Sequence, residues 1–248
     1  MLSKNTIKHI HSLRQVKYRK KLNEFIAEGN TIVKDFIKSN LQIIKIIANE
    51  DWIKNNKSLI KGVPFEIVSK NDMSRITFLK NPSEVLAIIN KPEFTLPDVE
   101  DSQNYILALD KIKDPGNLGT IIRTADWFGI KDIVCSKETV DAFNPKVIQA
   151  TMGSISRVKV HYYPLKEFLK EANGKIKVFG ATLKGKPIQD IPKAKKGILL
   201  IGSEAHGISK ELYPYINEEI FIPSAANSKA ESLNAAVATA LICYSFIL

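Results

Sequence analysis

The stretch Ile198-Leu-Leu-Ile-Gly-Ser-Glu-Ala-His-Gly-Ile-Ser209 combines the two features that decide the fold. Its four apolar residues in a row are typical of a strand that is buried on both faces, as in a parallel sheet. The strand then meets Gly202 and a turn that contains Glu204 and Gly207. This glycine spacing matches neither the GxxxxGK[S/T] phosphate loop nor the GxGxxG dinucleotide fingerprint, so kinase-like and NAD-dependent functions lose their main support.

Similar apolar runs recur on both sides of this stretch, and helical segments separate them. This alternation predicts an α/β fold in which helices cover both faces of a parallel sheet. Ligands of such sheets bind beyond the carboxyl ends of the strands. The predicted strands are Ile106–Leu109, Asp132–Cys135, Lys177–Ala181, Ile198–Ile201 and Glu219–Ile222.

A stretch with two prolines and several acids, residues 92–104, has the composition of a linker. We therefore expect an N-terminal domain at residues 1–91 and the sheet domain at residues 105–248. In the N-terminal part, apolar residues at helical spacing predict a helix over Thr31–Lys38. Short apolar runs between helical segments predict a small α/β domain with strands at Phe25–Ala27, Ile43–Ala48, Phe65–Val68 and Val85–Ile89.

The charge distribution indicates a polyanionic partner for the N-terminal part. The chain has a net charge of +10, and residues 1–91 hold 17 Lys and Arg against 8 Asp and Glu, although a solvated basic surface remains the plain alternative. No apolar run approaches the length of a membrane span, and the first thirty residues lack the apolar core of a signal peptide. Cys135 and Cys243 fit neither a disulfide framework nor a metal site, so we expect no metal and a cytoplasmic location.

A second segment with candidate catalytic residues follows the strand that ends at Leu109. Here Asp114-Pro-Gly-Asn117 predicts a turn and Leu118–Phe128 an amphipathic helix that contains Arg123. Taken alone, Asn117 is equally well explained as a turn or capping amide, and Arg123 as a solvated helix residue.

A third segment follows the last predicted strand. Its Ser232 resembles an N-cap before an alanine-rich helix. His206 has no second His or Cys near it in the sequence, which favours a surface role. Because each of the three segments follows a strand end, together they predict one site.

Three motifs in these segments resemble those of the SpoU family within the SPOUT methyltransferases: Asn117-Leu-Gly-Thr-Ile-Ile-Arg123, Gly202-Ser-Glu-Ala-His-Gly207, and Ile222-Pro223 with Ser232-Leu-Asn234. The N-terminal part is similar to the family's substrate-binding module, which opens with a basic helix, here at Ser12–Lys21. The resemblance spans nearly the whole chain. It implies methylation of a ribose 2′-hydroxyl in a structured RNA, either rRNA or tRNA, with S-adenosylmethionine as the cofactor.

The resemblance also implies a deep trefoil knot in the C-terminal domain and a homodimer whose sites lie near the subunit interface. By the same route, Gly202, Ile222 and Leu233 map onto positions that contact S-adenosylmethionine, and Thr182 onto the wall of its pocket.

In the family, the arginine of the first motif, here Arg123, is assigned the activation of the 2′-hydroxyl. Because a guanidinium is effectively always protonated, we interpret Arg123 as stabilising developing oxyanion charge and holding a neighbouring phosphate. The implied catalytic or positioning neighbours of Arg123 are Asn117, Glu204, Ser232 and Asn234.

The sequence departs from the family pattern in two places. Ser203 and Ala205 stand where the family often has Asn and Gly, and the loop Ser224–Glu231 lacks the usual glycine. A non-catalytic RNA-binding relative that has lost the cofactor is therefore an alternative. A SPOUT enzyme that methylates a base nitrogen should lack this arrangement around Arg123, whereas a resistance enzyme acting on rRNA would perform the same reaction.

Overall fold

The computed structural model describes residues 2–100, 102–192 and 194–248, which form two compact units. Unit 1 comprises the chain up to Glu93 together with Asp141–Arg157, and unit 2 comprises Phe94–Val140 together with Val158–Leu248. The expected boundaries kept residues 105–248 in one domain, whereas the structure groups Asp141–Arg157 with the N-terminal part. Asp101, within the predicted linker, lies outside the described residues.

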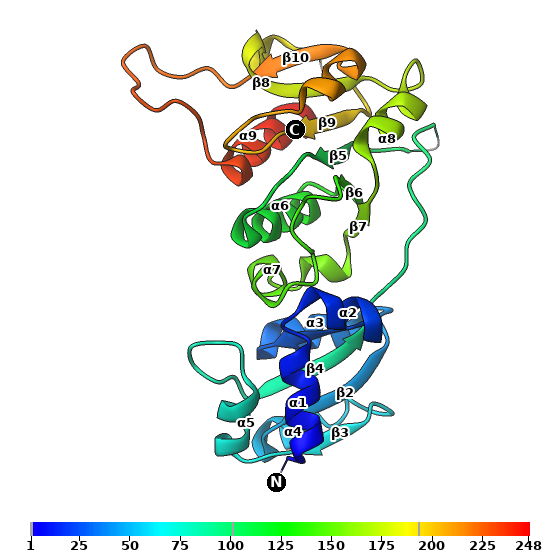
Figure 1. The fold of residues 1–248 in the computed structure, drawn as a ribbon, viewed down its shortest axis with the longest axis vertical. Helices are drawn as coiled ribbons and strands as arrows, with labels where there is room; N and C mark the ends of the chain where they lie inside the picture. Colours follow the sequence, from blue (N-terminus) through cyan, green and yellow to red (C-terminus); the bar gives the residue numbers. More distant parts are fainter. Residues whose placement is uncertain (1, 101, 193) are drawn as a thin grey trace. The chain divides into compact units, whose positions relative to one another are not determined.

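Unit 1 is built on a mixed sheet of strand order β1-β4-β2-β3 (Figure 1). β4 is antiparallel to both β1 and β2, and β3 is parallel to β2. The four predicted strands and the helix over Thr31–Lys38 are confirmed to within one residue at each end. The elements are α1 (Lys4–Ser12), α2 (Val16–Leu22), β1 (Glu24–Glu28), α3 (Asn30–Lys38), β2 (Ile43–Ala48), α4 (Glu50–Asn55), β3 (Phe65–Ile67), α5 (Lys70–Ile76), β4 (Val85–Asn90), α7 (Pro145–Thr151) and the 3₁₀ helix η1 (Ser154–Ser156).

The expected continuous basic helix over Ser12–Lys21 is wrong, because the chain breaks between α1 and α2. The Arg19 side chain, 2% exposed, explains the break. Its Nη1 donates to the backbone oxygens of Leu13 and Arg14, both at 2.8 Å, so these carbonyls need no helical partner. Its Nη2 lies 2.7 Å from Asp141 Oδ2, which ties the segment Asp141–Arg157 into unit 1.

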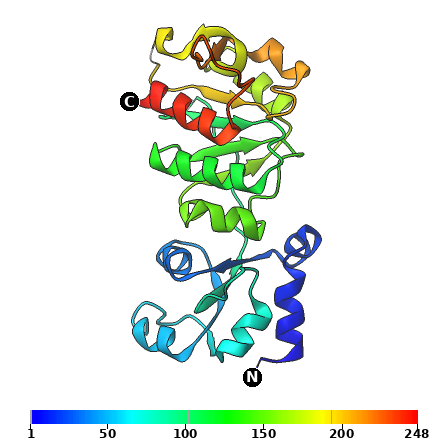
Figure 2. The same cartoon turned by 90° about the vertical axis from the view of Figure 1, so that its left-hand side faces the viewer.

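Unit 2 is an α/β fold on a six-stranded sheet of order β10-β8-β9-β5-β6-β7, in which every pairing is parallel. α8 and η3 pack on one face, and Figures 1 and 2 show α6 and α9 side by side on the other. The elements are β5 (Ile106–Leu109), α6 (Pro115–Trp127), β6 (Asp132–Cys135), β7 (Lys159–Tyr162), α8 (Leu165–Ala172), β8 (Val178–Pro187), η2 (Ile188–Asp190), β9 (Ile198–Ile201), η3 (Lys210–Tyr215), β10 (Glu218–Phe221) and α9 (Ala235–Ile247).

All five strands predicted for this unit are present, and β8 runs on to Pro187. The edge strand β7 was not predicted, because its exposed Lys159 and Tyr162 interrupt the apolar pattern of a buried strand. Among the described residues, no helix is both long and apolar enough to cross a membrane.

Candidate active site

The strand order places two of the predicted segments next to each other. β5 and β9 are neighbours in register, with Leu109 paired to Ile201. Just beyond the strands, Asp110 N donates to Ile201 O at 2.9 Å. The segment that leads into α6 and the turn at residues 202–207 therefore start side by side at the carboxyl edge of the sheet.

One carboxylate oxygen joins residues from all three segments. Glu204 Oε1 accepts hydrogen bonds from Asn234 Nδ2 at 2.7 Å, Ala235 N at 2.9 Å and Asn117 Nδ2 at 3.1 Å. Asn234 Nδ2 also donates to Asn117 Oδ1 at 2.8 Å. We call these three side chains, Asn117, Glu204 and Asn234, the Glu204 cluster.

The helix caps explain how the cluster is held. Asn234 caps α9, because its Oδ1 accepts from Ala236 N at 3.0 Å and Val237 N at 3.3 Å. The interpretation of Ser232 as the N-cap is therefore wrong. The predicted turn at residues 114–117 is instead the start of α6: Asp114 Oδ1 accepts from Asn117 N at 2.8 Å, which leaves the Asn117 side chain for Glu204.

The turn after β9 is folded tightly on itself. Ser203 N donates to Gly207 O at 3.1 Å and Gly207 N donates to Ser203 O at 2.8 Å. A Cβ on Gly202 would lie 2.1 Å from the Gly207 carbonyl carbon. The tight turn therefore leaves no space for a side chain at residue 202. This explanation adds to the close approach of a ligand that the sequence suggested.

Three residues that the sequence analysis did not select support this turn. Asp110 is 2% exposed, and its Oδ2 accepts from Ser209 N at 2.8 Å. Lys111 has a left-handed backbone with φ of 57°, and its Nζ donates to Ser209 Oγ at 2.8 Å. The available sequence signal was the position of Asp110 as the first polar residue after a buried strand.

The other predicted catalytic residues are not held in this way. Arg123 lies on the exposed side of α6 and Ser232 in the loop before α9. Neither side chain forms a hydrogen bond or an ion pair with any residue that the structure describes. The structure therefore brings together Asn117, Glu204 and Asn234, and leaves Arg123 and Ser232 outside their hydrogen-bond network.

The predicted cofactor contacts lie around the same edge of the sheet. Gly180 of β8 pairs with Leu200 of β9, and two residues further along each chain lie Thr182, still within β8, and Gly202, just after β9. Thr182 Oγ1 donates to Lys184 O. Ile222 and Leu233 stand at the two ends of an open loop between β10 and α9, where Leu233 is 44% exposed (Figure 1). No group of three or more potential ligands that could hold a metal occurs in the described part of the chain.

Solved structures share this architecture over nearly the full chain. The S-adenosylmethionine-bound rRNA methyltransferase from Sinorhizobium meliloti superposes with a TM-score of 0.89 and 30% identity, covering 99% of this chain and 95% of that one. An RNA methyltransferase of the TrmH family from Porphyromonas gingivalis gives a TM-score of 0.87 and 33% identity, covering 99% and 98%. The fold is that of the SpoU and TrmH class of RNA methyltransferases.

Sequence comparison defines the family more closely. The model of the SpoU rRNA Methylase family matches residues 104–244, and the MRM3-like substrate binding domain matches residues 4–87. The chain belongs to the SpoU rRNA methylase family. It is 32% identical to the 23S rRNA (guanosine(2553)-2′-O)-methyltransferase RlmP of Bacillus subtilis, over 96% of this chain and 94% of that enzyme.

Proposed function

We propose that this protein transfers a methyl group from S-adenosylmethionine to the 2′-hydroxyl of a ribose in ribosomal RNA. The observation that carries the proposal is the convergence of Asn117, Glu204 and Asn234, one from each motif, on a single hydrogen-bonded cluster. The Bacillus subtilis relative is named for this reaction on 23S rRNA, and the Sinorhizobium meliloti structure contains the cofactor.

The residues near the sheet edge fit a purine-containing cofactor. Adenine packs between apolar side chains and hydrogen-bonds to nearby polar groups. Ile222 and Leu233 offer apolar side chains that the chain itself leaves partly exposed, Thr182 lies within β8, and Gly202 follows the neighbouring strand β9. We propose these four residues as the cofactor contacts. When bound, S-adenosylmethionine supplies an electrophilic methyl group.

The chain's own contribution is to hold and activate the ribose oxygen. Arg123 keeps its charge at any physiological pH, so in this proposal it stabilises negative charge on O2′ and holds an adjacent phosphate, whose oxygen receives the proton. The Glu204 cluster holds α6, the turn and α9 in one frame, and Ser232 completes the site from the loop. Such orientation lowers a barrier by roughly 7 to 11 kcal/mol in favourable cases.

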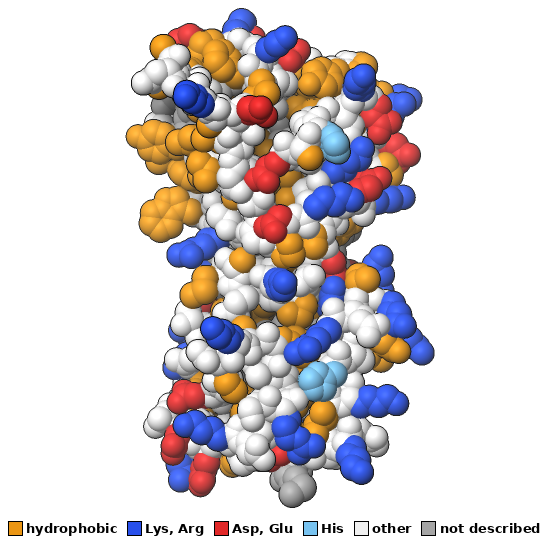
Figure 3. All heavy atoms as spheres, turned by 60° about the vertical axis from the view of Figure 1, so that its left-hand side comes forward, with side chains coloured by type: hydrophobic (Ala, Val, Ile, Leu, Met, Phe, Trp, Pro, Cys, Tyr) orange, Lys and Arg blue, Asp and Glu red, His pale blue; other side chains and the backbone are white. Residues whose placement is uncertain are grey.

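We assign the RNA backbone to unit 1. Figure 3 shows Lys and Arg side chains spread over its surface, in agreement with the basic surplus of residues 1–91. Phosphate contacts of this kind release counterions, so RNA affinity should fall steeply as salt rises. The match to the MRM3-like substrate binding domain and the named activities of the relatives favour rRNA over tRNA.

We further propose a homodimer through the outer face of α9. The exposed residues of α9 and its C-cap residue are all apolar and recur at i, i+4, i+7 and i+11: Val237, Leu241, Tyr244 and the C-cap Leu248. Trp127 of the adjacent α6 is 85% exposed, and Figure 3 shows hydrophobic side chains gathered along one edge of this unit. An apolar patch of this kind marks a protein interface. Arg123 lies one turn before Trp127, so a partner would sit beside the site.

The proposed compartment is the cytoplasm. Burial raises the pKa of both thiols, that of Cys243 to about 12, so they stay protonated and unreactive without needing to pair.

Isothermal titration with S-adenosylmethionine tests the proposed function first. We expect the wild type and a matched Leu22→Arg control in unit 1 to bind at micromolar concentration, and Leu233→Arg to lose binding because its side chain blocks the pocket. Methylation mapping of rRNA incubated with the wild type should then show a new 2′-O-methyl group. Failure of the wild type to bind the cofactor, even with bulk rRNA present, would favour the non-catalytic RNA-binding relative.

A further inference from the structure

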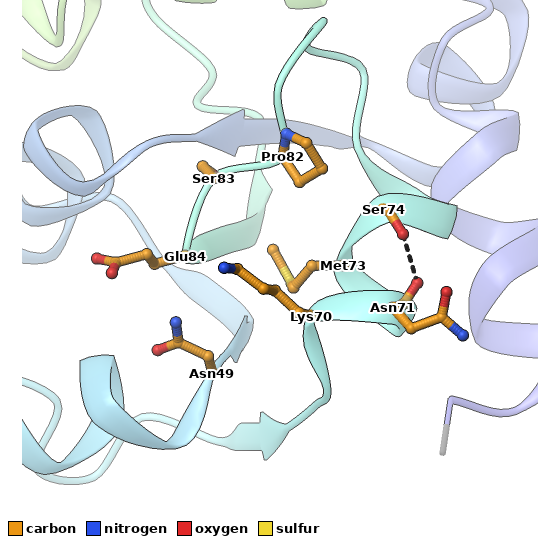
Figure 4. A pocket seen from close by; sticks show the side chains of 8 residues that line it. All are labelled: Asn49, Lys70, Asn71, Met73, Ser74, Pro82, Ser83 and Glu84. Atoms are coloured by element: carbon orange, nitrogen blue, oxygen red, sulfur yellow. Dashed lines mark hydrogen bonds between the residues drawn. The ribbon is translucent and has the colours of Figure 1, made fainter.

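Unit 1 contains a pocket of about 430 Å³, a volume in the range of small-molecule sites (Figure 4). It lies between the start of α5 and the segment that leads into β4. Its lining comes entirely from unit 1, so the pocket is distinct from the Glu204 cluster of unit 2. The lining residues are Asn49, Lys70, Asn71, Met73, Ser74, Pro82, Ser83 and Glu84.

One exposed apolar group suits the pocket to a flat ring. Met73 also lines the pocket, but it is only 1% exposed because it packs in the core with Ile47 and Leu86, so it closes the pocket toward the core. The exposed Pro82 ring lines the wall, and a heterocyclic base can pack against it (Figure 4).

The polar groups of the pocket have hydrogen-bonding capacity to spare. Asn49 Oδ1 accepts from Trp52 N at 2.8 Å, but Asn49 Nδ2 donates to no described residue. The Lys70 ammonium and the Glu84 carboxylate form no ion pair within the described part of the chain. Asn49 N donates to Glu84 O at 3.0 Å, which keeps these two residues together. Figure 4 shows the Lys70 side chain extending across the pocket toward Glu84.

We propose that this pocket binds one unpaired base of the RNA substrate, with a preference for guanine; the proposal rests on the proposed function. Guanine presents the acceptors O6 and N7, which suit the Lys70 and Asn49 donors. Its N1–H and N2–H groups suit the Glu84 carboxylate, and neither adenine, cytosine nor uracil offers that pair of donors beside an acceptor. Base pairing occupies this edge, so recognition requires single-stranded RNA.

Fluorescence anisotropy with the full-length protein tests the base preference. The probes are labelled U₄XU₄ nonamers in which X is G, A, C or U, and a duplex of the G nonamer. We expect the G nonamer to bind about 5- to 150-fold more tightly than the others, the range that one good base contact provides, and the duplex to lose this advantage. Equal binding of all four nonamers by the wild type would overturn the proposal.

Matched variants separate the pocket from the general basic surface. Glu84→Gln and Asn49→Asp should bind all four nonamers alike, and the Asp side chain can still accept the hydrogen bond from Trp52 N. Lys70→Ala should lose the preference, whereas Lys57→Ala, which removes the same charge from an exposed site outside the pocket, should retain it. A guanine preference that survives in both Glu84→Gln and Lys70→Ala contradicts the assignment.

The cofactor titration distinguishes the two proposals. Unchanged S-adenosylmethionine binding together with a lost guanine preference in Glu84→Gln supports the pocket. With rRNA as substrate, the same variant should raise KM and leave kcat unchanged. A wild type that binds cofactor but shows no base preference overturns the pocket alone, and one that prefers guanine but binds no cofactor overturns the proposed function alone.

Discussion

The candidate site has two parts that differ in how the protein holds them. The Glu204 cluster is joined by hydrogen bonds between three segments. Arg123, by contrast, is exposed and has no hydrogen bond to a described residue, and the mostly exposed loop from Ile222 to Leu233 has hydrogen bonds within itself, from Ser228 N to Ala225 O and from Ala230 N to Ser228 Oγ. This difference indicates that hydrogen bonds within the chain are sufficient to hold the Glu204 cluster in place. We expect the groups proposed for the ribose and the cofactor to form their hydrogen bonds when these ligands bind, as catalytic hydrogen bonds often do.

The comparison predicts two kinds of variant. A change in the cluster or its turn should lower both stability and activity, and a change in the exposed part should lower activity alone.

The largest effect is expected at Arg123. Arg123→Ala should reduce kcat by about 10²- to 10³-fold, the usual cost of removing a group that stabilises transition-state charge. The melting temperature should stay unchanged, because the side chain has no partner among the described residues. Single-turnover methylation and thermal denaturation measure the two quantities. If Arg123→Lys keeps nearly full turnover and RNA affinity, the role of this residue does not depend on the two parallel N–H donors that a guanidinium offers to a phosphate.

Gly202→Ala tests the turn. An added Cβ would lie 2.1 Å from the Gly207 carbonyl carbon, so the turn must move, at a cost of about 1 to 3 kcal/mol in stability and with loss of cofactor affinity. Gly207→Ala is the comparison: space around its Cβ is open, and only its φ of 65° opposes the change, at about 1 to 2 kcal/mol. Urea denaturation and cofactor titration measure both. Tight cofactor binding by a fully stable Gly202→Ala would show that the turn is not tight.

Glu204→Gln should have a smaller effect on both properties. An amide keeps the size of the side chain and one oxygen for the three N–H donors, but it removes the negative charge that strengthens these hydrogen bonds. Because the site is exposed, we expect a loss of about 0.5 to 1.5 kcal/mol in stability, together with reduced turnover. The exposed Glu211→Gln is the matched control. Loss of activity with full stability would place Glu204 with Arg123 rather than in the frame.

The smallest expected effect on stability concerns a second carboxylate, that of Glu28 in unit 1, which we compare with the carboxylate of Glu204. Glu28 Oε2 accepts from Thr77 Oγ1 at 2.6 Å and its Oε1 from Phe78 N at 2.7 Å, but unlike Glu204 it is only 4% exposed. Burial raises the pKa of Glu28 above 4.5, although these hydrogen bonds and the charge of Arg14 lower it.

A raised pKa has a defined consequence for stability. The contribution of protonated Glu28 is complete below its unfolded value near 4.5 and is lost as pH rises through its higher folded pKa. The melting temperature of the wild type should therefore fall relative to that of Glu28→Gln as pH increases above about 4.5. Parallel curves for the two proteins would show that burial does not perturb this carboxyl.

The sequence predicted every strand of the two sheets except the edge strand β7, together with the three segments of the site, because buried strands leave uninterrupted apolar runs. It could not predict that one oxygen of Glu204 joins all three segments, since periodicity carries no information on contacts between residues 117 and 234. It also assigned the α9 cap to Ser232 instead of Asn234, because both residue types suit that position and only the path of the chain decides between them.

The grouping of Asp141–Arg157 with unit 1 escaped prediction for a similar reason. Arg19 and Asp141 meet across a long stretch of chain, and each alone resembles an ordinary surface charge. Phe143 likewise packs on Phe25, with ring centroids 4.8 Å apart, although nothing near Phe143 in the sequence points to a strand of the N-terminal part.

This grouping has a consequence for how the protein matures during translation. The ribosome delivers the first 93 residues, then β5, α6 and β6, and only afterwards the residues that Arg19 and Phe25 contact. In the nascent N-terminal unit, Arg19 and Phe25 therefore lack their contacts with Asp141 and Phe143 until part of the methyltransferase sheet has emerged. Domains made from one continuous segment can fold one after another on the ribosome, whereas the contacts of Arg19 and Phe25 with residues 141 and 143 can form only after the first strands of the second unit have been synthesised.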